Sequence, residues 1–222
     1  FQIKKILIKK YFYNDKYFNK ILRKKKDKRI ESEYKKILKL KKKIKFVYQN
    51  KPDGTGDAVL KAKKYITGSH FLMLFPDDLI MKRNCSKDMI SIHNKHNCSV
   101  MASIKVKKNN VSRWGIYSVK KKLNKLNFTI NDVVEKPNIK KAPSTNAVIG
   151  RYILPKEIFS KLQNLNKGIG GEIHITDAIR KLINENHMFI GHNFAGKYLD
   201  CGTMKGYIKS SLEVSKLWNY AW

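Results

Sequence analysis

The chain has 222 residues, of which 42% are hydrophobic, so it can bury a sizeable core and is not disordered throughout. No apolar run approaches the roughly 20 residues that span a bilayer, and three widely spaced cysteines without a CxxC pair argue against a disulfide framework, so we expect a cytoplasmic protein without a membrane segment. The net charge of +31 fits a polyanionic partner. The basic residues are mostly Lys, however, whereas the readout of nucleic-acid bases favours Arg. We therefore favour a solvated lysine-rich surface over specific nucleic-acid binding.

Residues 1–45 are the most basic stretch, and apolar residues at helical spacing predict a helix over residues 31–40. Beyond them, strand and helix patterns alternate. Strands are predicted over residues 44–49, 71–75, 99–106, 115–119, 128–135, 147–154 and 188–194. Helices are predicted over residues 57–64, 88–95, 155–162, 176–184 and from 203 onward. This alternation predicts an α/β fold with a mixed, mostly parallel sheet and helices on both faces.

Three local signals refine these elements. The uninterrupted apolar run over residues 71–75 predicts a buried strand, which Pro76 stops. Pro155 is expected to open the helix that follows it, because its fixed φ suits the first turn. Thr176 is expected to cap the next helix through its hydroxyl.

Carboxylates follow two of the apolar segments. Asp77 comes directly after Phe75-Pro76, and Asp200 ends Tyr198-Leu199-Asp200 near the C-terminus. In open α/β sheets, ligands bind outside the carboxyl ends of the strands, where two such carboxylates could share one Mg²⁺ that also bridges phosphate oxygens. Acidic residues are also common in the turns that follow strands, so each motif alone leaves a purely structural interpretation open.

The segment that begins at Gln49 contains the two glycines Gly54 and Gly56 before the predicted helix. Glycine lets backbone N–H groups approach a ligand closely, and the Gln49 amide carries the donor and acceptor that a pyrimidine edge requires. The segment is not a P-loop, because no Gly-Lys-Ser/Thr ends it. An ordinary strand–turn–helix connection remains the alternative.

Glu135 and Lys136 stand at the end of a predicted strand and before Pro137. A carboxylate can accept hydrogen bonds from two sugar hydroxyls, and the lysine can neutralise a phosphate as a point charge. Pro137 ends the strand and can re-aim Lys136 toward the same ligand. The alternative is an edge strand that closes in a turn.

Seven motifs follow one another along the chain. They are Gln-x4-Gly-x-Gly-x-Ala, Pro-Asp-Asp, Arg-Trp-Gly-Ile, Val-Val-Glu-Lys-Pro, Ala-Val-Ile-Gly-Arg-Tyr-Ile-Leu, Gly-Gly-Glu-Ile-x-Ile-Thr-Asp-Ala and Asp-Cys-Gly-Thr. In this order they resemble the bacterial UTP–glucose-1-phosphate uridylyltransferases, nearly continuously from Phe46 to about Glu213. The resemblance implies a Rossmann-like nucleotidyltransferase fold and a homo-oligomer. It also implies a single domain over residues 1–222, with a basic helical region over 1–45 and a sugar-nucleotide-binding core over 46–222.

The resemblance implies a role for each matching residue. Gln49 and Gly54 would contact uracil, and Asp77 would bind Mg²⁺ with Asp200 in support. Gly115 would contact glucose through its backbone. Glu135 would hold the sugar hydroxyls, and Lys136 would hold the sugar phosphate. The implied substrates are UTP and glucose 1-phosphate, and the product is UDP-glucose. A glucose 1-phosphate oxygen would attack the α-phosphorus of UTP and pyrophosphate would leave. Asp77 and Lys136 would then carry catalysis through positioning and charge neutralisation.

The chain departs from the family pattern in three places. No glycine precedes Gly54, so no residue matches the Gly-x-Gly-Thr-Arg loop that holds the triphosphate in this family. His174 stands where the family commonly has Gln, and Asn146 is displaced by one position from the usual Ser-Asn-x-Ala. We therefore expect a domain that lacks its N-terminal glycine-rich loop and makes UDP-glucose poorly.

Two alternatives remain at this stage. The first is another sugar-1-phosphate nucleotidyltransferase, such as a thymidylyltransferase, which a competition between UTP and dTTP would separate. The second is an inactive basic fragment that binds polyanions, for which steep salt dependence of RNA or membrane binding would be the signature. The second does not explain why the acidic and basic motif residues recur in family order.

Overall fold

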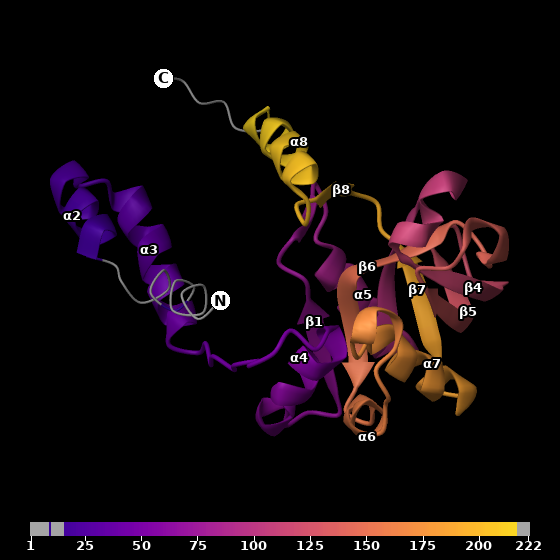
Figure 1. The fold of residues 1–222 in the computed structure, drawn as a ribbon. Helices are drawn as coiled ribbons and strands as arrows, with labels where there is room; N and C mark the ends of the chain where they lie inside the picture. Colours follow the sequence, from indigo (N-terminus) through magenta and orange to yellow (C-terminus); the bar gives the residue numbers. More distant parts are fainter. Residues whose placement is uncertain (1–8, 10–15, 217–222) are drawn as a thin grey trace. The chain divides into compact units, whose positions relative to one another are not determined.

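The computed structural model describes residue 9 and residues 16–216, and contacts within the chain divide it into two compact units, residues 1–51 and residues 52–222. The predicted single domain therefore stays a prediction, and each unit is described separately. In the first unit, helices α2 (Lys16–Lys25) and α3 (Lys28–Lys41) follow one another (Figure 1). Asp27 caps α3 by accepting hydrogen bonds from the backbone N–H groups of Arg29 and Ile30, which satisfies donors that the helix leaves unpaired.

The predicted strand over residues 44–49 is wrong. These residues have no regular secondary structure, although their composition is rich in apolar and aromatic side chains. A strand exists only through ladder hydrogen bonds to a second strand, and the described part of residues 1–51 otherwise contains helices. The predicted helix over residues 31–40 is confirmed as part of α3.

The second unit is built on a six-stranded sheet with the order β1-β6-β3-β7-β5-β4, and a separate two-stranded sheet joins β2 to β8. The strands are β1 (His70–Leu74), β2 (Asp78–Met81), β3 (Ser99–Lys105), β4 (Gly115–Lys122), β5 (Asn127–Glu135), β6 (Asn146–Pro155), β7 (Phe189–Asn193) and β8 (Lys197–Asp200). The α-helices are α4 (Thr55–Lys61), α5 (Cys85–His96), α6 (Ile158–Gln163), α7 (Ile175–Asn184) and α8 (Met204–Ser215). Short 3₁₀ turns are η1 (Lys63–Tyr65), η2 (Lys108–Arg113), η3 (Ile139–Lys141) and η4 (Ile169–Gly171).

The large sheet is mixed, as predicted, but it is not mostly parallel. Among the described strands only β3 and β7 pair in parallel, whereas β6 runs antiparallel to β1, β3 and β4, and β5 runs antiparallel to β4 and β7. Sequence alternation predicted parallel pairs because helices follow several strands. The long strand β6, however, lies between β1 and β3 and reverses direction there, so it converts two neighbouring pairings into antiparallel ones.

Helices cover both faces of this sheet, which confirms the predicted layers. Helices α6 and α7 lie side by side against one face (Figure 1), where Phe159, Ile179 and Phe189 belong to the larger core cluster. Helix α5 covers the other face, where Met89 packs with Val100. The hydrophobic core therefore lies on both sides of the sheet, and amphipathic helices cover each side.

Three local expectations need correction. Strand β1 lies at the end of the strand order and is not buried, since Leu72 and Leu74 are 36% and 50% exposed. Pro155 ends β6 opposite His70 and does not open a helix, because α6 begins only at Ile158. Thr176 lies inside α7, whose N-cap is His174, and its hydroxyl bonds elsewhere.

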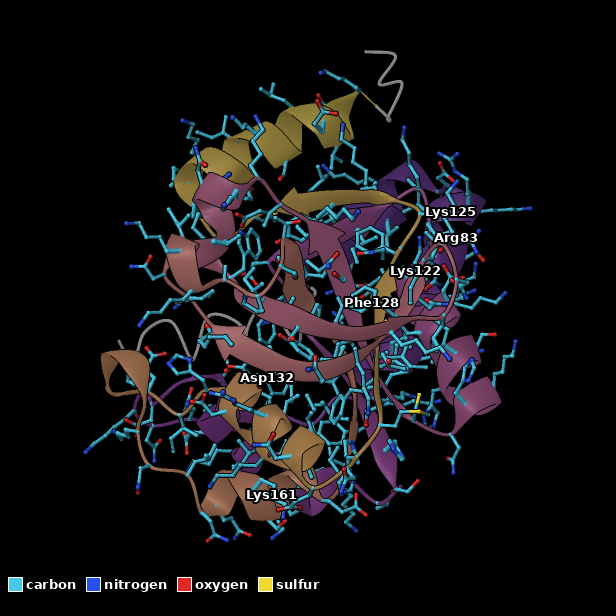
Figure 2. All side chains as sticks on the ribbon, turned by 90° about the vertical axis from the view of Figure 1, so that its right-hand side faces the viewer. Arg83, Lys122, Lys125, Phe128, Asp132 and Lys161 are labelled. Carbon is cyan, nitrogen blue, oxygen red and sulfur yellow. The ribbon has the colours of Figure 1, made fainter. Side chains whose placement is uncertain are left out.

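The surface of the second unit carries many lysines. Lys122 and Lys125 lie exposed at the turn between β4 and β5, whereas the neighbouring Phe128 is buried (Figure 2). This contrast fits the prediction of a solvated lysine-rich surface. No helix within the described ranges has both the length and the apolar character that crossing a membrane requires.

Candidate active site

A cavity of about 480 Å³ opens in the second unit. Its walls come from the β1–β2 connection, the turn before β4, the end of β5, the middle of β6, the start of α7 and the end of β8. Five of the residues singled out in the sequence lie in its lining: Asp77, Gly115, Glu135, Lys136 and Asp200. Residues that are up to 123 positions apart in sequence (77 to 200) thus meet at one site.

The carboxylates of Asp77 and Asp200 converge on Gly202. A Cβ atom built on Gly202 would lie 2.7 Å from Asp77 Oδ2 and 3.3 Å from Asp200 Oδ1, so a side chain there would intrude between them. The backbone N–H of Cys201 donates to the Asp77 carbonyl over 2.8 Å, which ties the two loops together. The Asp77 carboxylate itself makes no hydrogen bond or ion pair with any residue that the structure describes.

This pair of carboxylates suits a divalent cation that keeps other ligands. Among residues 9 and 16–216, no group of three or more His, Cys, Asp or Glu side chains could hold a metal. Mg²⁺ is usually held by one or two carboxylates, with water and substrate phosphates completing the octahedron. Two converging carboxylates therefore fit a divalent cation whose remaining ligands are water molecules or phosphate oxygens.

The neighbouring Asp78 has a different environment from Asp77. It is 8% exposed, and its carboxylate accepts hydrogen bonds from the Gly150 backbone N–H and the Tyr198 hydroxyl. Burial raises the pKa of the Asp78 carboxyl, and these two hydrogen bonds oppose that rise. Burial, with the bond to Asp78, raises the pKa of the Tyr198 phenol. Asp78 thus joins β2 and β8 to strand β6, a structural role that sequence reasoning did not assign to it.

Glu135 is held at the end of β5 by a threonine hydroxyl. Thr176 Oγ1 donates to Glu135 Oε2 over 2.9 Å, and Thr176 is only 4% exposed. Glu135 pairs in register with Gly115 on β4, and a Cβ on Gly115 would lie 3.2 Å from Glu135 Oε2. Any larger residue at position 115 would therefore press on the carboxylate.

Lys136 follows Glu135 with a left-handed backbone, at φ 44°. Its N–H donates to the Trp114 carbonyl over 3.0 Å, and its Nζ lies 3.9 Å from Glu135 Oε1. The left-handed residue breaks the alternation of the strand, so Lys136 and Glu135 line the same cavity. The expectation that the chain re-aims Lys136 before Pro137 thus agrees with this backbone geometry.

Gly54 and Gln49 differ from the other predicted residues. Gly54 has φ 97°, and a Cβ there would lie 2.6 Å from the Ile173 carbonyl, so the turn requires glycine. Gly54 is not in the cavity lining, although the adjacent Thr55 is. Gln49 belongs to the first unit. The uracil contacts expected for both residues stay predictions.

Arg113 and Thr176 line the same cavity, although sequence reasoning gave neither a role in the site. Arg113 Nη2 lies 3.3 Å from Asp200 Oδ2, and its guanidinium lies 5.7 Å from the centre of the Trp114 ring. Both residues belong to motifs already noted, Arg-Trp-Gly-Ile and Ile-Thr-Asp-Ala. The motifs were a usable signal, but side-chain direction was needed to assign a role.

Comparisons with known proteins show which proteins this chain is similar to. UTP–glucose-1-phosphate uridylyltransferase 2 of Streptococcus pyogenes serotype M3 is 36% identical over 173 residues, which cover 76% of this chain and 58% of the relative. A solved UDP-glucose pyrophosphorylase complexed with UDP-glucose superposes with a TM-score of 0.78 at 34% identity, covering 86% of this chain and 74% of that one. A UTP-bound UGPase from Acinetobacter baumannii gives a TM-score of 0.75 at 28% identity, covering 96% and 74%.

The chain thus spans somewhat over half the length of the curated relative. The resemblance predicted from motif order is confirmed, and so is the α/β nucleotidyltransferase fold. The sequence profile described as nucleotidyl transferase matches residues 9–216. On this match the chain belongs to the nucleotidyl transferase family.

Proposed function

We propose that this chain carries the site for transfer of a uridylyl group from UTP to glucose 1-phosphate, which forms UDP-glucose and pyrophosphate. The observation that carries the proposal is that Asp77, Asp200, Glu135 and Lys136 line one cavity. A pair of carboxylates for a cation and an acid–lysine pair for a sugar phosphate are the two parts that this reaction requires. The relatives named above, including one with UDP-glucose and one with UTP, support the same reaction.

In this proposal the sugar phosphate is held by adjacent residues. The Glu135 carboxylate accepts hydrogen bonds from sugar hydroxyls, and Thr176 keeps it in place from behind. The Lys136 ammonium neutralises the phosphate as a point charge. Gly115 lines the cavity beside Glu135, where a side chain would press on the carboxylate, and its backbone would contact the glucose. Gln49 and Gly54 would contact the uracil.

Asp77 and Asp200 would hold the cation, which we propose to be Mg²⁺. When bound, Mg²⁺ would neutralise phosphate oxygens and fix their orientation for in-line substitution. The attacking group is already an anionic phosphate oxygen, so no protein nucleophile or strong base is required. The protein's contribution is therefore to position the two phosphates and to offset their mutual repulsion.

The proposal includes self-association, which the resemblance implies. One chain has a mass of 25.9 kDa, so light scattering coupled to size exclusion would report the number of copies directly. A mass of one chain at every concentration would contradict this part of the proposal and leave the reaction untouched.

Binding of UDP-glucose tests whether the proposed site recognises the product of the proposed reaction. With Mg²⁺ present, we expect saturable binding by calorimetry and a loss of about tenfold in affinity for Lys136→Ala, because a charge-assisted contact to phosphate is removed. Lys140→Ala is the matched control, since Lys140 is an exposed lysine outside the cavity lining. Tighter binding of dTDP-glucose than of UDP-glucose would reassign the site to thymidylyl transfer, and equal binding by Lys136→Ala would remove Lys136 from the phosphate.

A further inference from the structure

Arg113 lines the cavity from the end of η2, and one residue, Trp114, separates it from the start of β4. Its Nη2 lies 3.3 Å from Asp200 Oδ2, and its side chain is 54% exposed. The guanidinium lies 5.7 Å from the centre of the Trp114 ring, within the range of a cation–π contact. The Arg113 guanidinium therefore contacts the Trp114 ring and makes only a weak ion pair with the Asp200 carboxylate.

Asp200 uses both of its oxygens in this arrangement. Oδ1 accepts a hydrogen bond from the Gly202 N–H over 2.9 Å, and Oδ2 faces Arg113. The nearby Asp77 carboxylate makes no such bond among the described residues. A cation that is shared by Asp77 and Asp200 would compete with Arg113 for the carboxylate of Asp200.

Acidic side chains outnumber Arg113 and Lys136 in the lining of the cavity. Five carboxylic acids line it, namely Asp77, Asp78, Glu135, Glu172 and Asp200, whereas Arg113 is its arginine, Lys136 its lysine and His174 its histidine. An excess of negative charge repels a diphosphate. Since Lys136 is assigned to the sugar phosphate, Arg113 is the other lining cation that could meet the nucleotide phosphate.

We propose that Arg113 exchanges partners: it pairs with Asp200 in the ligand-free protein and donates to a nucleotide phosphate oxygen once Asp200 is engaged by a divalent cation. This inference rests on the proposed function. An ion pair that is half exposed and 3.3 Å long costs little to break, whereas the forked guanidinium matches a phosphate well. Arg113 thus replaces a protein contact with a ligand contact and leaves no buried charge unpaired.

The exchange predicts opposite effects of one substitution. Arg113→Gln should tighten the binding of Mn²⁺ alone by about threefold, because it removes a competitor of modest strength. The same variant should weaken UDP-glucose binding at saturating Mn²⁺ by about tenfold, because it removes a charge-assisted donor to phosphate. Arg113→Lys should retain part of the phosphate affinity, since the charge stays and the fork is lost.

The measurements are Mn²⁺ binding by electron paramagnetic resonance and UDP-glucose binding by calorimetry. Arg180→Gln is the matched control, because Arg180 is 52% exposed and paired with Asp132 over 2.9 Å outside the cavity lining. It should leave both affinities unchanged. A purely structural role of Arg113 would weaken both ligands together, and that result would overturn the inference.

The two proposals fail in different ways. If the unsubstituted chain does not bind UDP-glucose, the proposed function is wrong and the phosphate half of the exchange falls with it. If the chain binds UDP-glucose and Arg113→Gln leaves that affinity unchanged, only the exchange is wrong. Looser or unchanged Mn²⁺ binding in Arg113→Gln would likewise overturn the competition at Asp200.

Discussion

Adjacent acidic residues at this site have different environments, because of what surrounds each side chain. The Asp77 carboxylate faces the cavity beside Gly202, whereas Asp78 points back toward the sheet and is bonded by Tyr198 and Gly150. Asp77 lies in the turn between β1 and β2, whereas Asp78 is the first residue of β2, so the turn presents one carboxylate to the cavity and the strand directs the next to the fold. Thr176 and Glu135 form a second pair in which a buried hydroxyl orients an accessible carboxylate.

The two aspartates are expected to separate binding from stability. Asp77→Ala should abolish tight Mn²⁺ binding and change the free energy of unfolding by less than about 0.5 kcal/mol, since no described partner is lost. Asp78→Ala should destabilise the protein by about 2 kcal/mol, because it leaves the buried Gly150 N–H and Tyr198 hydroxyl without an acceptor. Urea unfolding and Mn²⁺ titration check both. Near-normal Mn²⁺ binding by Asp77→Ala would remove that residue from the cation.

The Thr176 hydroxyl is expected to act through Glu135. Thr176→Val keeps the shape but removes the 2.9 Å hydrogen bond, so UDP-glucose affinity should fall several-fold, with a loss of about 1 kcal/mol in stability. Thr176→Ser should restore the affinity, since it supplies the same donor. Calorimetry of both variants checks this, and a Thr176→Val protein that binds like the parent would show that Glu135 is oriented without the hydroxyl.

At the scale of elements, β1 departs most from what its composition indicates. Its run of apolar residues reads as a central strand, yet β1 ends the strand order and pairs only with β6 among the described strands. An edge strand offers unpaired backbone groups to other chains, and exposed apolar side chains strengthen such contacts. The strand positions Asp77 correctly because the antiparallel β1–β6 pairing, with Leu74 opposite Arg151, sets its register.

Leu74→Lys tests this edge. Leu74 is 50% exposed, so the substitution should change the free energy of unfolding by less than about 0.5 kcal/mol. A lysine on the edge should lower concentration-dependent association in light scattering. Leu212→Lys on α8, where Leu212 is 59% exposed, removes a similar apolar side chain away from the sheet edge. Equal effects of the two substitutions would argue against strand-edge association.

At the scale of the whole molecule, histidines with lowered pKa values contribute to the dependence of stability on pH. Burial lowers the pKa of His70 below 6.5, His93 and His187 lower it further, and Glu157 opposes them. The rings of His70 and His93 lie 4.5 Å apart. Burial also lowers the pKa of His192. The folded protein therefore protonates these imidazoles less readily than the unfolded chain does.

The free energy of unfolding is expected to fall as the pH drops below about 6.5, because these histidines then bind protons more readily in the unfolded chain than in the folded protein. The loss continues down to the lowered pKa of the folded state and then levels off for each histidine. His70→Gln should reduce the slope of stability against pH between 7 and 5, to an extent that urea unfolding across that range, in steps of about half a pH unit, would measure. An unchanged slope would exclude His70 as a contributor.

Much of the fold and of the site followed from the sequence. The helix of residues 31–40, most strands of the second unit and the helices on both sheet faces agree with periodicity, because amphipathic patterns report which side of an element is buried. Asp77, Glu135, Lys136 and Asp200 could be named as candidates because each belongs to a motif at or just after the end of a strand, where ligands bind in open sheets, and all four line one cavity.

Tertiary structure decided the rest, since these features depend on contacts between distant segments. Strand pairing made β6 antiparallel to its neighbours, left β1 at the edge and left residues 44–49 without a strand. Side-chain direction separated Asp78 from Asp77 and brought Arg113 to Asp200, 87 positions away in the sequence. Local patterns record burial and turn chemistry, but a hydrogen bond between remote residues is determined only when the chain has folded.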